Sequence, residues 1–158
     1  MKNQDVQKII SGIKKDHDAG NDKEAVDGAR KLQESNLTDT NILFAIAGIF
    51  IDSGYPINDI EAVDTGISIF QSLLEDNVFS SSEEAVASTK YNISNGCYSR
   101  FQLLKKQGEL DKASVELKKA KNFIQDALLN TDKLGFHLRS QAMANYGNMS
   151  LPWFTRHN

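Results

Sequence analysis

Cysteine and proline are scarce in this chain of 158 residues, which has one cysteine, Cys97, and two prolines. A single cysteine cannot form a disulfide within the chain, and it excludes a metal centre held by several thiolates. Ten glycines and two prolines provide few of the turns that an all-β fold requires. The net charge of −3 excludes a generally basic nucleic-acid coat. The length favours one compact domain.

Long hydrophobic runs are also missing. The longest apolar stretch, residues 42–51, is far shorter than the roughly 20 residues that a membrane-spanning helix needs. The first eight residues are polar and are not followed by an apolar segment, so they do not resemble a secretory signal. We therefore expect a cytoplasmic protein that does not enter a membrane.

Hydrophobic residues instead recur at helical spacing along nearly the whole chain. Val6, Ile9, Ile10 and Ile13, for example, fall at i, i+3, i+4 and i+7, which places them on one face of a helix. No segment shows a convincing alternation of period two. The sequence predicts an all-α fold with about seven helices, the first ending before residue 20 and the others near 21–34, 39–53, 58–74, 81–107, 111–130 and 132–148.

Three glycines between predicted helices indicate an internal repeat. Gly20 and Gly54 are 34 residues apart, and Gly108 lies in a similar setting. A glycine can end a helix in the left-handed conformation, so that a short turn reverses the chain. Each glycine precedes a small residue that can sit where two helices cross; these residues are Ala25, Ala62 and Ala113.

Several segments resemble the tetratricopeptide repeat. Residues 106–113 are similar to the turn of that family, and residues 91–95 and 145–149 are similar to its first-helix signature. The resemblance implies a right-handed α-solenoid of antiparallel helix hairpins, which serves as a non-catalytic scaffold for a protein or peptide. It divides the single array 1–158 into repeats at about 3–36, 39–76, 81–130 and 133–149, the last one partial, with a tail at 150–158.

The array departs from the family pattern in two places. The step from Gly54 to Ala62 is three residues longer than the step from Gly20 to Ala25, and the first helix of the third repeat is seven residues longer than usual. The fourth repeat lacks its second helix. Either Leu151, Trp153 and Phe154 fold back as a cap, or the chain is the front piece of a longer array, which we prefer. The unfinished half-repeat could also pair with a second copy of the chain and form a homodimer.

The resemblance also implies a binding groove along the first helices. Matched residue by residue, it assigns to that groove Asn92, Asn95, Tyr98, Asn145 and Asn148. An asparagine amide can donate and accept hydrogen bonds, so it can hold an extended peptide backbone without selecting side chains. The alternative for each asparagine is a hydrogen bond at the helix surface or between repeats.

Charge is divided unevenly between the two halves. Residues 1–79 carry a net charge of −7 and residues 80–158 carry +4. The basic residues of the second half form either a solvated helix face or a patch for an acidic partner or RNA. The patch would consist of Arg100, Lys105, Lys106, Lys118, Lys119 and Lys121.

Residues 145–148 are also similar to repeats that precede HEPN-type RNase domains. This similarity implies an alternative function, a regulatory or sensing array of a larger effector. That family's catalytic signature is an arginine followed by a histidine four to six residues later, and none of the four arginines here has a histidine at that distance.

Catalytic motifs are not recognisable. The three histidines, His17, His137 and His157, do not have metal-binding spacing and are interpreted as surface residues. Cys97 is interpreted as a buried packing residue of a long helix. No glycine-rich phosphate-binding loop occurs. We therefore expect a protein that is not an enzyme and that uses no metal and no cofactor.

Overall fold

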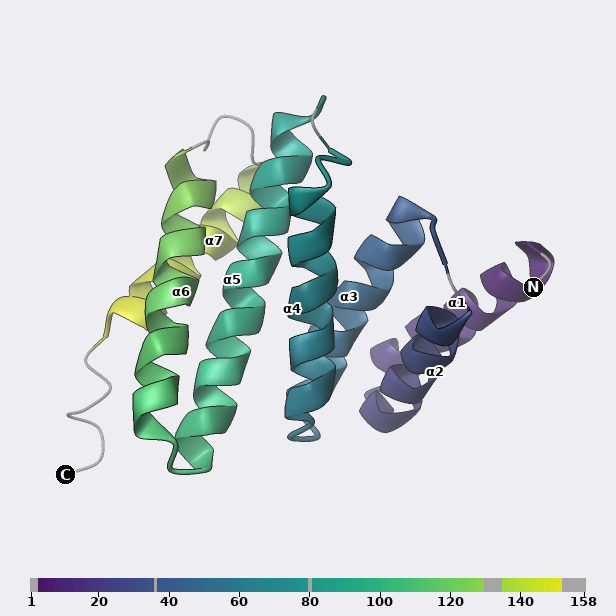
Figure 1. Ribbon diagram of the computed structural model, residues 1–158, viewed down its shortest axis with the longest axis horizontal. Coiled ribbons are helices and arrows are strands. Elements are labelled where there is room, and N and C mark those ends of the chain that lie inside the picture. Colours follow the sequence, from purple (N-terminus) through teal and green to yellow (C-terminus); the bar gives the residue numbers. More distant parts are fainter. Residues whose placement is uncertain (1–2, 36, 80, 130–134, 152–158) are drawn as a thin grey trace. The chain divides into compact units, whose positions relative to one another are not determined.

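A computed structural model of the protein describes residues 3–35, 37–79, 81–129 and 135–151. These residues form seven α-helices and no strand (Figure 1), which confirms the predicted all-α class. The chain divides into two compact units, Met1–Val78 and Phe79–Asn158, called unit 1 and unit 2 below. The division falls between the second and third predicted repeats.

Unit 1 contains four helices that pack in chain order: α2 against α1 and α3, and α3 against α4. Its large fully buried side chains are Leu32, Phe50 and Phe70, and the ring of Phe70 meets that of Phe44 edge to face at 5.0 Å. The helices are α1 (Asn3–Asp18), α2 (Asp22–Glu34), α3 (Thr40–Gly54) and α4 (Ile60–Glu75).

Two of the three repeat glycines behave as the sequence predicts. Gly20 follows α1 with φ 75° and Gly108 follows α5 (Glu83–Lys106) with φ 78°, so both take the left-handed conformation. In each case the next helix begins within two residues of the glycine. The three predicted crossing residues, Ala25, Ala62 and Ala113, are completely buried, as expected for small side chains between packed helices.

The left-handed conformation predicted for Gly54 is wrong. Gly54 is the last residue of α3 and is not among the glycines with positive φ. A Cβ atom at this position would lie 2.9 Å from Cβ of Ala62, so the glycine is needed for close packing of α3 against α4. The left-handed residue of this longer turn is Asn58, with φ 57°, and the side chain of Asp59 then caps α4 by accepting from the amide of Ala62 at 2.9 Å.

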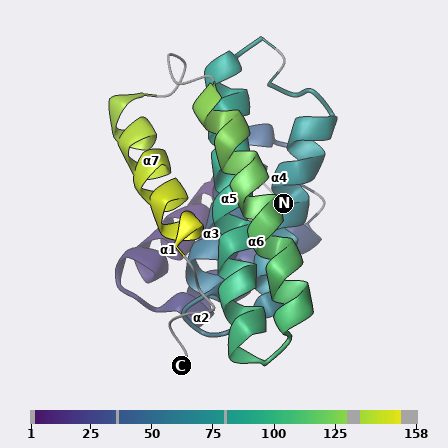
Figure 2. The ribbon, with the colours of Figure 1, turned by 90° about the vertical axis from the view of Figure 1, so that its left-hand side faces the viewer.

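Unit 2 contains α5, α6 (Leu110–Leu129) and α7 (Phe136–Ser150). The two long helices lie side by side, and α7 packs against both of them (Figure 2). The buried hydroxyl of Ser94 on α5 donates to the carbonyl oxygen of Ala120 on α6 at 2.7 Å, which fixes the register of this pair. The predicted helix start near Asp132 and the tail residues Trp153, Phe154 and His157 lie outside the described residues.

Candidate functional site

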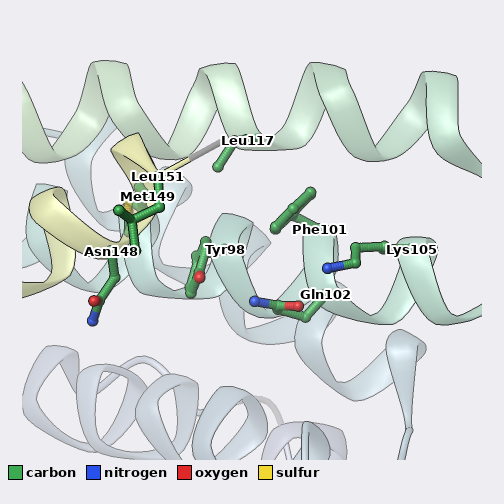
Figure 3. Close-up of a pocket in the computed structure, with 8 residues that line it drawn as sticks. All are labelled: Tyr98, Phe101, Gln102, Lys105, Leu117, Asn148, Met149 and Leu151. Atoms are coloured by element: carbon green, nitrogen blue, oxygen red, sulfur yellow. The ribbon is translucent and has the colours of Figure 1, made fainter. Parts of the chain in front are cut away.

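A pocket of about 40 Å³ lies in unit 2, where the end of α7 meets α5 and α6. Figure 3 shows the polar ends of Tyr98, Gln102 and Asn148 on the side of the pocket away from Leu117. The pocket is thus polar along one side and apolar along the other. Its lining consists of Tyr98, Phe101, Gln102 and Lys105 of α5, Leu117 of α6, and Asn148, Met149 and Leu151 at the end of α7.

The α5 wall of this pocket is held together by contacts among its own side chains. The rings of Tyr98 and Phe101 stack with centroids 5.6 Å apart and planes at 28°. The ammonium group of Lys105 lies 5.8 Å from the centroid of the Phe101 ring. Stacked aromatic rings and a cation over a ring are both attractive arrangements. These side chains of α5 therefore support one another at the pocket.

Two of the predicted groove asparagines pair with each other. The Nδ2 atom of Asn145 on α7 donates to Oδ1 of Asn95 on α5 at 3.0 Å and to the hydroxyl oxygen of Tyr91 at 3.1 Å. These bonds join α7 to α5, so the two asparagines contact each other across helices, as in the alternative given above for hydrogen bonding between the predicted repeats. Asn95 and Asn145 thus position α7, and through it Asn148.

The remaining predicted groove residues are divided. Tyr98 and Asn148 come from different helices, and both line the pocket. Asn92 is half-buried on α5 and is not part of the lining. The prediction missed Phe101 and Gln102, although the spacing of α5 could have shown them, since residues 98, 101, 102 and 105 follow i, i+3, i+4 and i+7.

The predicted basic patch contains an acidic centre. The side chain of Glu116 is only 7% exposed, and its Oε1 lies 3.0 Å from Nη1 of Arg100 and 2.8 Å from Nζ of Lys119. A buried carboxylate requires such partners because it has lost its water. Lys105 lies over the aromatic ring of the pocket. Lys106 and Lys118 are exposed, and Lys121 is half-buried.

Cys97 is buried, as predicted, and next to this cluster. Burial raises the pKa of its thiol to about 12, and the negative charge of Glu116 adds to the shift. A thiol that stays protonated is a poor nucleophile and metal ligand. The surroundings of Cys97 thus favour a role in core packing over one as a nucleophile or metal ligand.

His17 is more constrained than a surface histidine. Its Nδ1 atom lies 2.9 Å from the hydroxyl oxygen of Ser53, a completely buried residue of α3. This contact joins α1 to α3 across 36 residues, and no sequence motif marks it. His137, in contrast, is exposed, with its Nε2 atom 3.0 Å from Nε2 of Gln141 one turn later.

Among the described residues, no three His, Cys, Asp or Glu side chains are grouped closely enough to hold a metal ion. None of the helices in the described part of the chain has the length and apolar character to cross a membrane. Comparisons with protein-family models, with curated proteins and with solved structures find no match to this chain.

Proposed function

We propose that this chain is a non-catalytic scaffold of tetratricopeptide type that binds a protein or peptide. In this proposal α1 with α2, α3 with α4 and α5 with α6 are antiparallel hairpins of a right-handed solenoid, and α7 is the first helix of a further repeat. The left-handed glycines after α1 and α5 and the buried alanine at each predicted crossing support this arrangement.

One observation carries the binding function. Tyr98 and Asn148 were assigned from two separate segments, 50 residues apart, and they line the same pocket. Asn148 is exposed, so its amide can donate to and accept from the backbone of a bound segment. The hydroxyl of Tyr98 and the amide of Gln102 add further polar groups on the same side (Figure 3).

The pocket is small, and its size limits what enters it. A volume of about 40 Å³ holds a few water molecules. It therefore takes one small side chain of a partner, which would meet the exposed side chain of Leu151 on the apolar side of the pocket. The rest of the partner would lie across the surface, with its backbone near Asn148.

This proposal can be tested with a displayed library of random peptides, selected on the full chain. Tyr98→Phe removes one hydroxyl and keeps the ring stack, and Asn148→Ala removes one amide. Each change should weaken a selected peptide about fivefold to tenfold, the value of one hydrogen bond. Asn122→Ala is the matched control, because Asn122 is an exposed asparagine of α6 outside the pocket.

Two results would contradict the proposal. One is that the selection yields no peptide, although circular dichroism shows a folded helical protein. The other is that the selected peptides bind Tyr98→Phe and Asn148→Ala as tightly as they bind the wild type.

A second candidate function, self-association through α7, is favoured by its exposed apolar residues. Met143 is 57% exposed, and Leu151 just beyond the helix is 46% exposed. Burial of such side chains against a second copy would stabilise a dimer. Light scattering over a concentration series should then show a dimer that Met143→Glu converts to a monomer. A monomer mass at every concentration would contradict this function.

A further inference from the structure

A second and larger hollow lies in unit 1, along one side of α4. It has a volume of about 510 Å³ and is an open groove between residues of α2, α3 and α4, the helices labelled in Figure 1. This volume is within the range of ligand-binding clefts. The groove lies wholly within residues 33–76, and none of its residues takes part in the pocket of unit 2.

The groove has an apolar floor and a polar, acidic edge. Leu43, Ile69 and Leu73 supply apolar surface. The α4 wall is a single helix face, since its residues follow the spacing i, i+3, i+4, i+7, i+8 and i+11. That face consists of Thr65, Ser68, Ile69, Ser72, Leu73 and Asp76, with Asp64 beside it.

None of the described residues that line this groove is a cation, and few cations lie near the groove in the sequence. Residues 32–89 contain ten Asp and Glu and no Lys, Arg or His. Two cations, Arg30 and the exposed Lys31, come just before this stretch, and Arg30 is held by Asp59, with Nη2 and Oδ2 2.7 Å apart. The groove therefore lies in a strongly negative part of the chain, where the potential attracts positive charge.

We propose that this groove binds a cationic amphipathic helix of a partner protein. Apolar side chains of that helix would pack on Leu43, Ile69 and Leu73, and its Lys or Arg side chains would lie near Asp76. The lining of α4 runs from Thr65 to Asp76, 11 residues further along the chain, which corresponds to about 17 Å of helix. A partner helix of about three to four turns matches this length.

The test uses the full chain and a fluorescein-labelled peptide of about 14 leucine and lysine residues that forms an amphipathic helix. Binding of this peptide is measured by fluorescence anisotropy. A peptide with glutamate in place of lysine tests the charge, and one with serine in place of leucine tests the apolar floor. The leucine–lysine peptide should bind, and its affinity should fall as salt increases. Both altered peptides should bind at least tenfold more weakly.

Substitutions then locate the probe. Ser68→Lys places a cation on an exposed position of the groove wall and should weaken binding about tenfold. Ser11→Lys adds the same charge on an exposed position of α1 outside the groove and should weaken binding less. Asp76→Asn should weaken binding about threefold, while Glu75→Gln, the neighbouring exposed acid outside the lining, should not change it.

Three results would overturn the proposal. The first is equal binding of the lysine and glutamate peptides. The second is that Ser68→Lys and Ser11→Lys weaken binding equally, which would mean that only the overall charge matters. The third is that the chain dimerises and that Ser68→Lys abolishes the dimer, which would make a second copy the occupant. Because the probe binds in unit 1, Tyr98→Phe and Asn148→Ala should leave its affinity unchanged, so this proposal and the proposed function fail separately.

Discussion

Gly66 provides a sharp test of how closely α4 approaches α3. A Cβ atom added at Gly66 would lie 2.6 Å from the carbonyl oxygen of Ala47 and 2.7 Å from Cγ1 of Ile51. The isoleucine can change its rotamer, whereas the carbonyl oxygen moves only if the backbone of α3 moves. Gly66→Ala should therefore destabilise unit 1.

The magnitude follows from two opposing effects. Overpacking a close-packed core costs about 1–3 kcal/mol, and a clash with backbone places the cost near the upper end. Alanine in place of glycine within a helix returns about 1 kcal/mol. The net loss is about 1–2 kcal/mol. In a unit the size of unit 1, this loss lowers the melting temperature by roughly 5–15 °C.

Gly48 is the matched control, because it lies within α3 and a Cβ atom there would meet nothing within 4 Å. Gly48→Ala should raise stability by up to about 1 kcal/mol. Thermal unfolding of both variants and the wild type can be followed by far-ultraviolet circular dichroism. If Gly66→Ala melts at or above the wild-type temperature while Gly48→Ala is stabilised, the close approach of the two helices is wrong.

Three further predictions concern single contacts. Asp59→Ala should lower the free energy of unfolding by about 1–2 kcal/mol in urea, because Asp59 caps α4 and also pairs with Arg30. Asn21→Ala should change it by less than about 0.5 kcal/mol, since the Asn21 side chain makes no cap hydrogen bond. In the folded protein at pH 9, Cys97 should react with a maleimide dye at least about a hundredfold more slowly than in the protein unfolded in urea, because burial raises the pKa of its thiol from 9.0 to about 12. Equal rates in the two states would refute its burial. Asn145→Ala should speed amide hydrogen exchange in α7, because two hydrogen bonds to α5 are lost. Asn148→Ala is the control, and equal exchange rates in the two variants would show that these bonds do not hold α7 in place.

Features that depend on neighbouring residues could be read from the sequence. The seven helices follow from hydrophobic spacing, and the turns at Gly20 and Gly108 follow from glycine's access to positive φ. The burial of Cys97 also follows, because it lies in a long helix among apolar residues. In each case the structural feature is determined by residues only a few positions away in the sequence.

Features that depend on distant residues could not be read in this way. Asn95 and Asn145 are 50 residues apart, and either could have faced a ligand as well as each other. Gly54 has the sequence setting of a turn glycine, yet its role is set by Ala62 on the facing helix. The groove along α4 needs three helices at defined distances, which local spacing does not contain. Helix faces are thus predictable, while what each face meets is not.

The basic stretch of unit 2 shows why this difference matters for function. Binding of RNA requires cations that face phosphates together, and each phosphate contact contributes to the salt dependence. In unit 2 the two cations Arg100 and Lys119 already face one buried carboxylate, that of Glu116. Moving them to a phosphate would leave that carboxylate buried without a partner, which is costly. The basic residues of this segment are therefore not all available to phosphates, because two of them already neutralise Glu116.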